Sequence, residues 1–84
     1  MTRRQEFARF ISHVIRDERA GYAVSISDLY AAVEREHSEL VDDEVETSTG
    51  ALRWKHEFRW ELETLVVRGD IKRRKDLGRG IYSA

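Results

Sequence analysis

Residues 52–84, LRWKHEFRWELETLVVRGDIKRRKDLGRGIYSA, carry the strongest structural signals in the chain. Apolar side chains recur through its first half on one side of a helix, at about 100° per residue. Gly69 follows this periodic segment, at the position where a left-handed residue ends many helices. The residues after it are rich in Arg and Lys and surround a turn that contains Gly and Asp. The stretch therefore predicts one long helix followed by a two-stranded hairpin.

The predicted helix has an apolar face and a polar face. The apolar face should pack against the remaining helices and contains Trp54, Phe58, Leu62, Leu65 and Val66. The far side holds Arg53, His56, Trp60, Glu63, Thr64 and Val67, with Lys55 and Arg59 at its margins. Trp60 is an exception, because it is a large aromatic side chain that points away from the core. Either the hairpin or the first helix covers it, or it is presented to a ligand.

Two short segments, 71–75 and 80–84, flank the turn 76–79 and predict the hairpin. Ile71, Ile81 and Tyr82 should anchor the hairpin to the core. The hairpin carries five cations, which are Lys72, Arg73, Arg74, Lys75 and Arg79. Like charges this close repel one another, so a polyanion that relieves the repulsion is the simplest explanation for them.

The first half of the chain predicts two further helices with a short strand between them. Thr2 and Gln5 have the spacing of a capping box, and a helix should span residues 3–20 and end at Gly21. Its apolar stripe consists of Phe7, Phe10, Ile11, Val14 and Ile15. Residues 22–26 are apolar and partly β-branched, which predicts a brief strand that pairs with the hairpin.

The second helix should begin at Asp28, with Ser27 as its N-cap. Its inward face would be Leu29, Ala32 and Val33, which His37, Leu40 and Val41 would extend by two turns. His37 fits a helix surface or the edge of the core better than a metal site. This helix, like the first, should contribute its apolar side chains to the hydrophobic core.

Length and composition limit the class of protein. Eighty-four residues predict one domain spanning 1–84, and 40% hydrophobic residues place it among globular domains. The absence of Cys excludes disulfides and thiol catalysis and fits a reducing cytoplasm, which is the expected location. The longest apolar run is only a few residues, and the start of the chain lacks a signal-peptide core, so we expect no membrane association.

The net charge of −1 conceals an asymmetry between the two halves of the chain. Residues 1–52 hold six Arg against eleven Asp and Glu, a net of −5, and residues 53–84 hold nine Lys and Arg against five Asp and Glu, a net of +4. Such a division is typical of a protein that presents one surface to a polyanion. The alternative is that both halves only keep the chain in solution.

The connection between the second and third helices, about residues 36–50, is acidic. Residues 36–46 contain six acidic side chains and no basic one. One interpretation is a solvated helix end and loop. The other is an acidic flap that disfavours incorrect orientations of a bound polyanion or that binds a basic partner. The connection is longer than the three or four residues that join the helices of a compact helix-turn-helix.

The predicted order of helix, short strand, helix, helix and hairpin is that of a winged helix-turn-helix, an α+β fold. The pattern Trp54-x-x-x-Phe58-Arg59-Trp60-x-x-x-x-Leu65-x-x-x-Gly69-x-Ile71, closing with Arg79-Gly80-Ile81-Tyr82, resembles the N-terminal winged-helix domain of Mrr-type restriction endonucleases. The resemblance covers residues 27–84. In that family the domain is taken to supply DNA recognition, sometimes of modified bases, while a separate nuclease domain cuts. Glu61 stands where the family tends to have a small residue, and no nuclease domain follows, so the resemblance implies a recognition module and not an enzyme.

A search of the sequence for catalytic motifs supports the same expectation. Phosphate-loop, dinucleotide, zinc-protease and nucleophile-elbow motifs do not occur. His13, His37 and His56 are dispersed without the paired spacing of metal ligands. We therefore expect no catalysis, no cofactor and no metal.

The sequence predicts a double-stranded DNA-binding module of a restriction, defence or transcription-regulating system, acting as a monomer or homodimer. The third helix would enter the major groove and the hairpin would follow the phosphate backbone. The residues expected to contact DNA are Arg53, Lys55, His56, Arg59, Trp60, Lys72, Arg73, Arg74, Lys75 and Arg79. The alternative is a winged helix that binds a protein partner, for example a nuclease subunit, through the acidic segment and Trp60. RNA binding is disfavoured by the scarcity of exposed aromatic residues.

Overall fold

In a computed structural model, which describes residues 2–41 and 52–84, the first helix begins at the predicted capping box. The Gln5 amide donates a hydrogen bond to the Thr2 hydroxyl, and the Thr2 amide donates one to the Gln5 side chain. The helix, α1 (Arg3–Ser12), buries its predicted apolar stripe together with the segment that follows it. The buried side chains are Phe7, Phe10, Ile11, Val14 and Ile15.

The prediction of one α-helix over residues 3–20 was wrong in its second half. α1 continues into a π-helical segment, η1 (His13–Glu18). The Arg19 amide donates to the carbonyl oxygen of Val14, five residues back, at 2.8 Å, which is the wider spacing of a π turn. Gly21 follows with a φ of 85°, so the left-handed residue lies where it was predicted.

The second helix starts two residues earlier than expected. Ser25, not Ser27, is the N-cap of α2 (Ile26–Glu36), and its hydroxyl accepts a hydrogen bond from the Asp28 amide at 3.1 Å. The shift arises because the strand β1 (Val24–Ser25) is shorter than residues 22–26 and delivers the chain to the helix at Ser25. Leu29, Ala32 and Val33 form the buried face of α2, as predicted.

α2 does not extend by two turns beyond its core face. It ends at Glu36, where His37 adopts a non-helical backbone, and a 3₁₀ turn, η2 (Ser38–Leu40), follows. Leu40 and Val41 nevertheless pack against the core as partly buried side chains. The His37 ring lies edge-on against Phe10 with centroids 5.0 Å apart, which is the core-edge position expected of it. Residues 42–50 of the predicted acidic connection lie outside the described residues.

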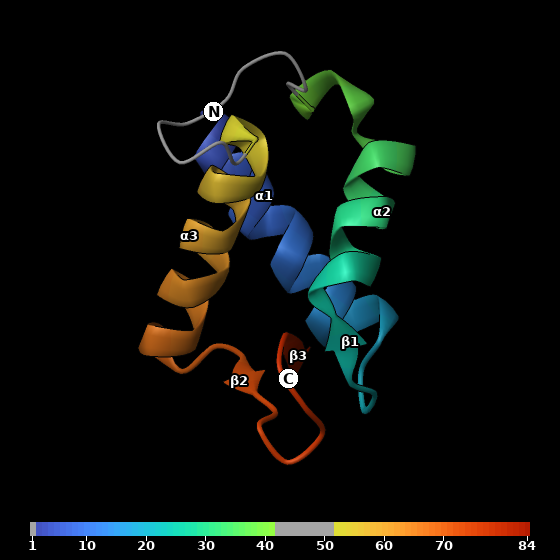
Figure 1. Ribbon diagram of the computed structural model, residues 1–84, viewed down its shortest axis with the longest axis vertical. Helices are drawn as coiled ribbons and strands as arrows, with labels where there is room; N and C mark the ends of the chain where they lie inside the picture. Colours follow the sequence, from blue (N-terminus) through green and yellow to red (C-terminus); the bar gives the residue numbers. More distant parts are fainter. Residues whose placement is uncertain (1, 42–51) are drawn as a thin grey trace.

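The long third helix is confirmed as α3 (Arg53–Arg68). Its predicted core face is confirmed as well: Trp54, Phe58, Leu62 and Leu65 are buried and Val66 is partly buried. The helix ends at Gly69, whose φ of 84° is left-handed. Figure 1 shows α3 and α2 on either side of α1.

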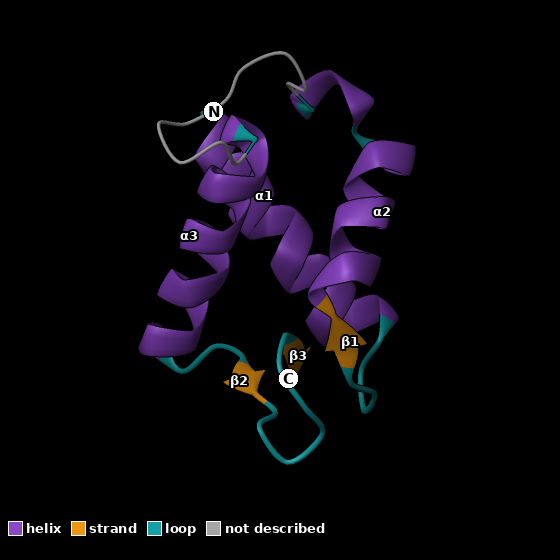
Figure 2. Cartoon of the chain, in the orientation of Figure 1, coloured by secondary structure: helices purple, strands orange, loops and turns teal. Residues whose placement is uncertain are grey.

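The hairpin strands β2 (Lys72–Arg73) and β3 (Ile81–Ser83) pair antiparallel, with Arg73 opposite Tyr82. β3 also pairs antiparallel with β1, with Val24 opposite Tyr82, so the strand order is β1-β3-β2. The predicted pairing of the early strand with the hairpin is therefore confirmed. Figure 2 shows the three strands gathered at one end of the helices, beside the C-terminus of α3 and the N-terminus of α2.

Of the predicted hairpin anchors, Ile71 and Tyr82 are buried and Ile81 is only partly so. The three helices and the small antiparallel sheet are compatible with the predicted winged-helix arrangement. Among the described residues, no helix has the length and apolar character needed to cross a membrane.

Replacing Gly69 with Ala is expected to lower the free energy of unfolding by about 1 kcal/mol, because a Cβ disfavours the left-handed backbone. A Cβ at Gly69 would meet no atom within 4 Å, so the cost arises from the backbone conformation and not from a clash. Urea unfolding followed by circular dichroism measures the change. Val67→Ala, at an exposed position of the last turn of α3, is the control and should change stability by less than about 0.5 kcal/mol. Equal stability of the two variants would contradict the prediction.

Candidate nucleic-acid interface

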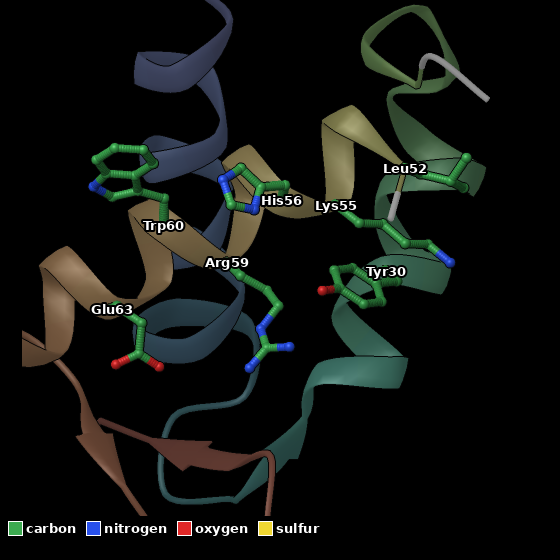
Figure 3. Close-up of a pocket in the computed structure, with 7 residues that line it drawn as sticks. All are labelled: Tyr30, Leu52, Lys55, His56, Arg59, Trp60 and Glu63. Carbon is green, nitrogen blue, oxygen red and sulfur yellow. The ribbon is translucent and has the colours of Figure 1, made fainter. Parts of the chain in front are cut away.

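Two adjoining hollows run along the exposed side of α3. The first, of about 690 Å³, lies between α3 and α2 and is lined by Tyr30, Leu52, Lys55, His56, Arg59, Trp60 and Glu63 (Figure 3). The second, of about 730 Å³, lies between α3 and the hairpin and is lined by Ile26, Arg59, Glu63, Arg73, Lys75, Gly78, Arg79, Gly80 and Tyr82. Because the two hollows share Arg59 and Glu63, they form one continuous surface, the basic groove.

The basic groove brings together seven of the ten residues predicted to contact DNA. They come from two parts of the chain, with Lys55, His56, Arg59 and Trp60 on α3 and Arg73, Lys75 and Arg79 on the hairpin. Arg53, Lys72 and Arg74 do not line it. Arg53 is exposed at the start of α3 and pairs with Glu57 at 3.3 Å, one turn along the helix.

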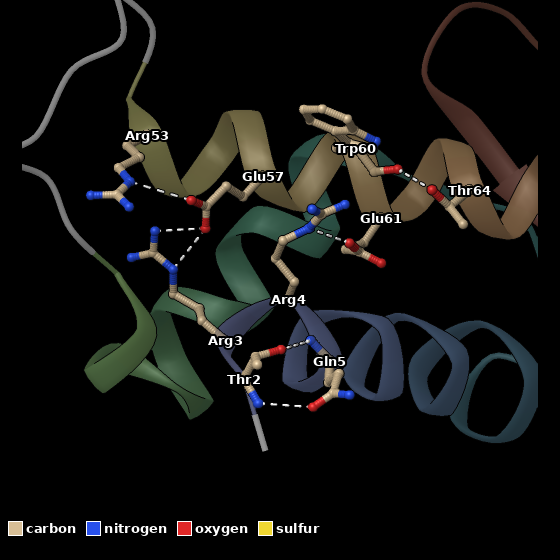
Figure 4. Close-up of polar contacts among 9 residues, drawn as sticks. All are labelled: Thr2, Arg3, Arg4, Gln5, Arg53, Glu57, Trp60, Glu61 and Thr64. Atoms are coloured by element: carbon tan, nitrogen blue, oxygen red, sulfur yellow. Dashed lines mark hydrogen bonds and ion pairs between the residues drawn. The ribbon is translucent and has the colours of Figure 1, made fainter.

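The acidic side chains of α3 are divided between its faces. Glu57 accepts from Arg3 of α1 at 2.6 Å, and Glu61 accepts from Arg4 at 2.6 Å. Figure 4 shows these two arginines reaching from α1 to α3. The Glu61 carboxylate is therefore neutralised by Arg4 and does not line the basic groove.

Trp60 lies at the rim of the basic groove. The Arg4 guanidinium lies 4.8 Å from the centroid of its ring, and the His56 ring stands edge-on at 6.0 Å. The side chain nevertheless keeps 55% of its surface exposed. The structure therefore combines the two interpretations of Trp60, because the first helix covers one part of the indole and another part faces solvent.

Two of the hairpin cations are paired with carboxylates, one on α3 and one in the hairpin turn. The Arg73 guanidinium donates to the Glu63 carboxylate, and Arg74 donates to both oxygens of Asp76 at 3.0 and 2.8 Å. These hydrogen bonds raise the pKa of both arginines and lower the pKa of Asp76. The repulsion expected among the five hairpin cations is thus partly relieved by neighbouring carboxylates.

The remaining hairpin cations have no such carboxylate. Within residues 2–41 and 52–84, Lys72, Lys75 and Arg79 form no ion pair. Lys75 and Arg79 line the basic groove, where they are exposed, while Lys72 lies outside it. These two groove cations are available to an anionic ligand without breaking an existing ion pair.

Tyr30 of α2 forms the wall of the groove opposite α3. Its hydroxyl points toward the Arg59 side chain (Figure 3), and the Lys55 ammonium lies 5.1 Å from the centroid of its ring. Burial raises the pKa of Tyr30 from 10.0 to about 12. The phenol is protonated at neutral pH, as any tyrosine with a pKa of 10 or more is, and can donate a hydrogen bond to an acceptor in the groove.

The sequence interpretation missed Tyr30, Glu63 and Tyr82 as groove residues. Tyr30 was detectable as a position bordering the apolar face of α2, beside Leu29. Glu63 follows Arg59 by four residues, a spacing that places the two side chains on the same helix face. Tyr82 could not be found in this way, because its place beside α3 depends on the pairing of the strands.

The groove and its surroundings contain no arrangement typical of a metal centre. Within the described part of the chain, no group of three or more His, Asp or Glu side chains is placed so that it could hold a metal ion. The groove instead offers cations, hydrogen-bond donors and an aromatic rim, which suit an anionic or planar ligand.

Comparison of the chain with protein-family models, curated proteins and solved structures found no significant match. The resemblance to the Mrr-type recognition domain therefore stays a prediction.

The raised pKa of Tyr30 predicts a loss of stability at alkaline pH. Between pH 10 and about pH 12 the unfolded chain releases the Tyr30 proton while the folded chain keeps it. The free energy of unfolding should therefore fall as the pH rises through this window. Tyr30→Phe has no such proton, so its unfolding free energy should fall less steeply, as measured by urea titrations across the window. Parallel curves for the two proteins would show that Tyr30 titrates normally in the fold.

Proposed function

We propose that this protein is a double-stranded DNA-binding module that places α3 in the major groove and the hairpin along the phosphate backbone. The observation that supports this most strongly is the composition of the basic groove. Five Lys and Arg side chains from α3 and the hairpin line one continuous surface, together with His56. The gathering of these charges offsets the nearly neutral net charge of the chain, because a polyanion interacts with the local field.

The shape of α3 supports the proposed docking mode. Its 16 residues give a helix of about 24 Å, at 1.5 Å per residue, and the major groove of B-DNA is wide enough to admit one helix. Arg59 lies near the middle of this helix and lines the basic groove of the protein. Its planar guanidinium has donors suited to the O6 and N7 atoms of guanine. Lys75 and Arg79 on the hairpin would contact phosphates and fix the register.

This function rests on a winged helix-turn-helix interpretation of the fold. Under it, α1, α2 and α3 form the three-helix unit and β2 with β3 forms the wing. The long connection before α3 departs from the compact form of that motif. The resemblance to Mrr-type domains adds the proposal that the module recognises DNA for a restriction, defence or regulatory system and has no catalytic activity of its own.

A second candidate function is protein binding, and the exposure of Trp60 favours it. Half-exposed tryptophans are common at the centre of protein interfaces. Trp60 and the exposed Val67 lie about two turns apart on α3. Retention of an ordinary DNA duplex at low salt distinguishes the candidates, because a module that binds only proteins would not retain it.

The affinity for duplex DNA should depend steeply on salt. If about four phosphates are contacted, a plot of the logarithm of the association constant against the logarithm of salt concentration should have a slope of about −4. Lys75→Ala and Arg79→Ala should each reduce the slope by about 1, measured by fluorescence anisotropy with labelled duplex. Arg16→Ala removes an exposed cation of η1 outside the groove and is the control. A flat salt response of the unaltered protein would contradict phosphate binding.

Two arginines of α3 provide a matched test of the docking face. Arg59 lines the groove, whereas Arg53 pairs with Glu57 outside it. Arg59→Ala should weaken binding to a preferred duplex by about 1–3 kcal/mol and relax sequence preference. Arg53→Ala should have a small effect on both quantities. Equal losses in the two variants would mean that the helix presents a different face to DNA.

A further inference from the structure

Glu63 is the carboxylate that the basic groove contains. Among the described residues that line the groove, it carries the only negative charge, and it borders both hollows. Two donors hold its side chain. The Arg73 guanidinium donates to Oε2, and the buried Tyr82 hydroxyl donates to Oε1 at 3.4 Å. The side chain retains 41% of its surface exposed.

A carboxylate at this position repels phosphate, so it opposes binding to DNA in general. It can favour binding only where it meets a hydrogen-bond donor. A carboxylate has about four acceptor positions on its two oxygens, and Arg73 and Tyr82 occupy two of them. The exposed remainder is free to accept from a group that enters the groove.

We propose that Glu63 is a specificity-determining residue that accepts a hydrogen bond from the N4 amino group of a cytosine in the major groove. This inference rests on the proposed function. Base edges in the major groove present amino donors on cytosine and adenine alone. Adenine places its N7 acceptor beside the amino group, which would repel a second carboxylate oxygen, and cytosine N4 has no such neighbour on its own base.

The position of Arg59 supports this assignment. Arg59 precedes Glu63 by four residues and lines the same two hollows. Side chains at this spacing lie about 6 Å apart along a helix axis, which corresponds to one or two base-pair steps of about 3.4 Å. Arg59 would read a guanine while Glu63 reads a nearby cytosine. We therefore expect a recognition site in which a guanine and a cytosine lie close together.

Tyr82 and Arg73 act as positioning residues for this contact. Tyr82 is 4% exposed and lies on β3, the strand between β1 and β2. The sheet therefore holds the Tyr82 side chain, and its hydroxyl, in a fixed position. Arg73 lies opposite Tyr82 on β2 and holds the second oxygen. The hairpin thereby sets the orientation of a side chain on α3.

Selection from random duplexes with the full 84-residue chain tests the proposal. The unaltered protein should enrich cytosine by roughly tenfold at one position close to a preferred guanine. Glu63→Gln should lose this enrichment and favour adenine at the same position, because an amide can bind adenine N6 and N7 together. Glu61→Gln makes the same charge change on α3, but Arg4 holds that carboxylate outside the groove, so it should keep the cytosine preference.

Two further variants separate base reading from charge and from folding. Glu63→Asp keeps the negative charge but shortens the side chain, so it should lose the cytosine preference without a general gain in affinity. Tyr82→Phe keeps the buried ring and should weaken the preference by a smaller factor. Thermal unfolding followed by circular dichroism identifies any variant that fails to fold, and the preference is then judged on the folded ones.

Three outcomes would overturn the inference. The first is a folded Glu63→Gln that keeps the preference of the unaltered protein. The second is a Glu63→Gln variant that binds all duplexes more tightly without a change of preference, which would mean that Glu63 only repels phosphate. The third is duplex binding without sequence preference in the unaltered protein. Failure to retain any duplex at low salt is a separate result that would overturn the DNA-binding proposal itself.

Discussion

The packing of Trp54 and Phe58 between the first two helices is the constraint on which the rest of the structure depends. Both side chains are fully buried, and Phe58 meets Phe7 and Tyr30 edge-on with ring centroids 5.4 Å apart. Because successive residues of a helix are about 100° apart, fixing one face fixes every other. The burial of these two aromatic residues therefore directs Arg59 into the basic groove.

The same constraint explains how a nearly neutral chain presents a cationic surface. With the core face of α3 fixed, Glu57 and Glu61 lie beside α1, where Arg3 and Arg4 pair with them. Both pairs are partly shielded from solvent, because the Glu57 and Glu61 side chains keep only 20% and 14% of their surface exposed. Their effect is on the field, because negative charge is paired on one side of α3 and unpaired positive charge remains on another.

Much of the fold could be predicted because its signals are local. The periodicity of the apolar residues predicted the core faces of all three helices, and the left-handed glycines at 21 and 69 were predicted from their positions alone. The start of α2 could not be predicted, because it depends on where β1 stops pairing with β3, a contact between residues far apart in the sequence. The π turn in η1 has no comparably specific sequence signal.

In the candidate site too, features set by local spacing could be predicted and features set by long-range contacts could not. Lys55, His56, Arg59 and Trp60 share a helix face, so their proximity followed from spacing. The pairing of Arg73 with Glu63 did not, because it joins the hairpin to α3 and depends on how the hairpin folds back. The sequence therefore indicated the cations, and the structure shows which of them already have a carboxylate partner among the described residues.

The place of β3 in the sheet bears on how the protein acquires its fold during synthesis. β3 is the last of the described elements to be made, yet it lies between β1 and β2 and its neighbour Gly80 accepts a hydrogen bond from the Ile26 amide at 2.8 Å. The early part of the chain therefore has no sheet partner until residue 83 has left the ribosome. Such long-range closure is slow relative to helix formation. The helices should form and begin to pack first, and the assembly of the sheet should be the step that completes the hairpin side of the basic groove.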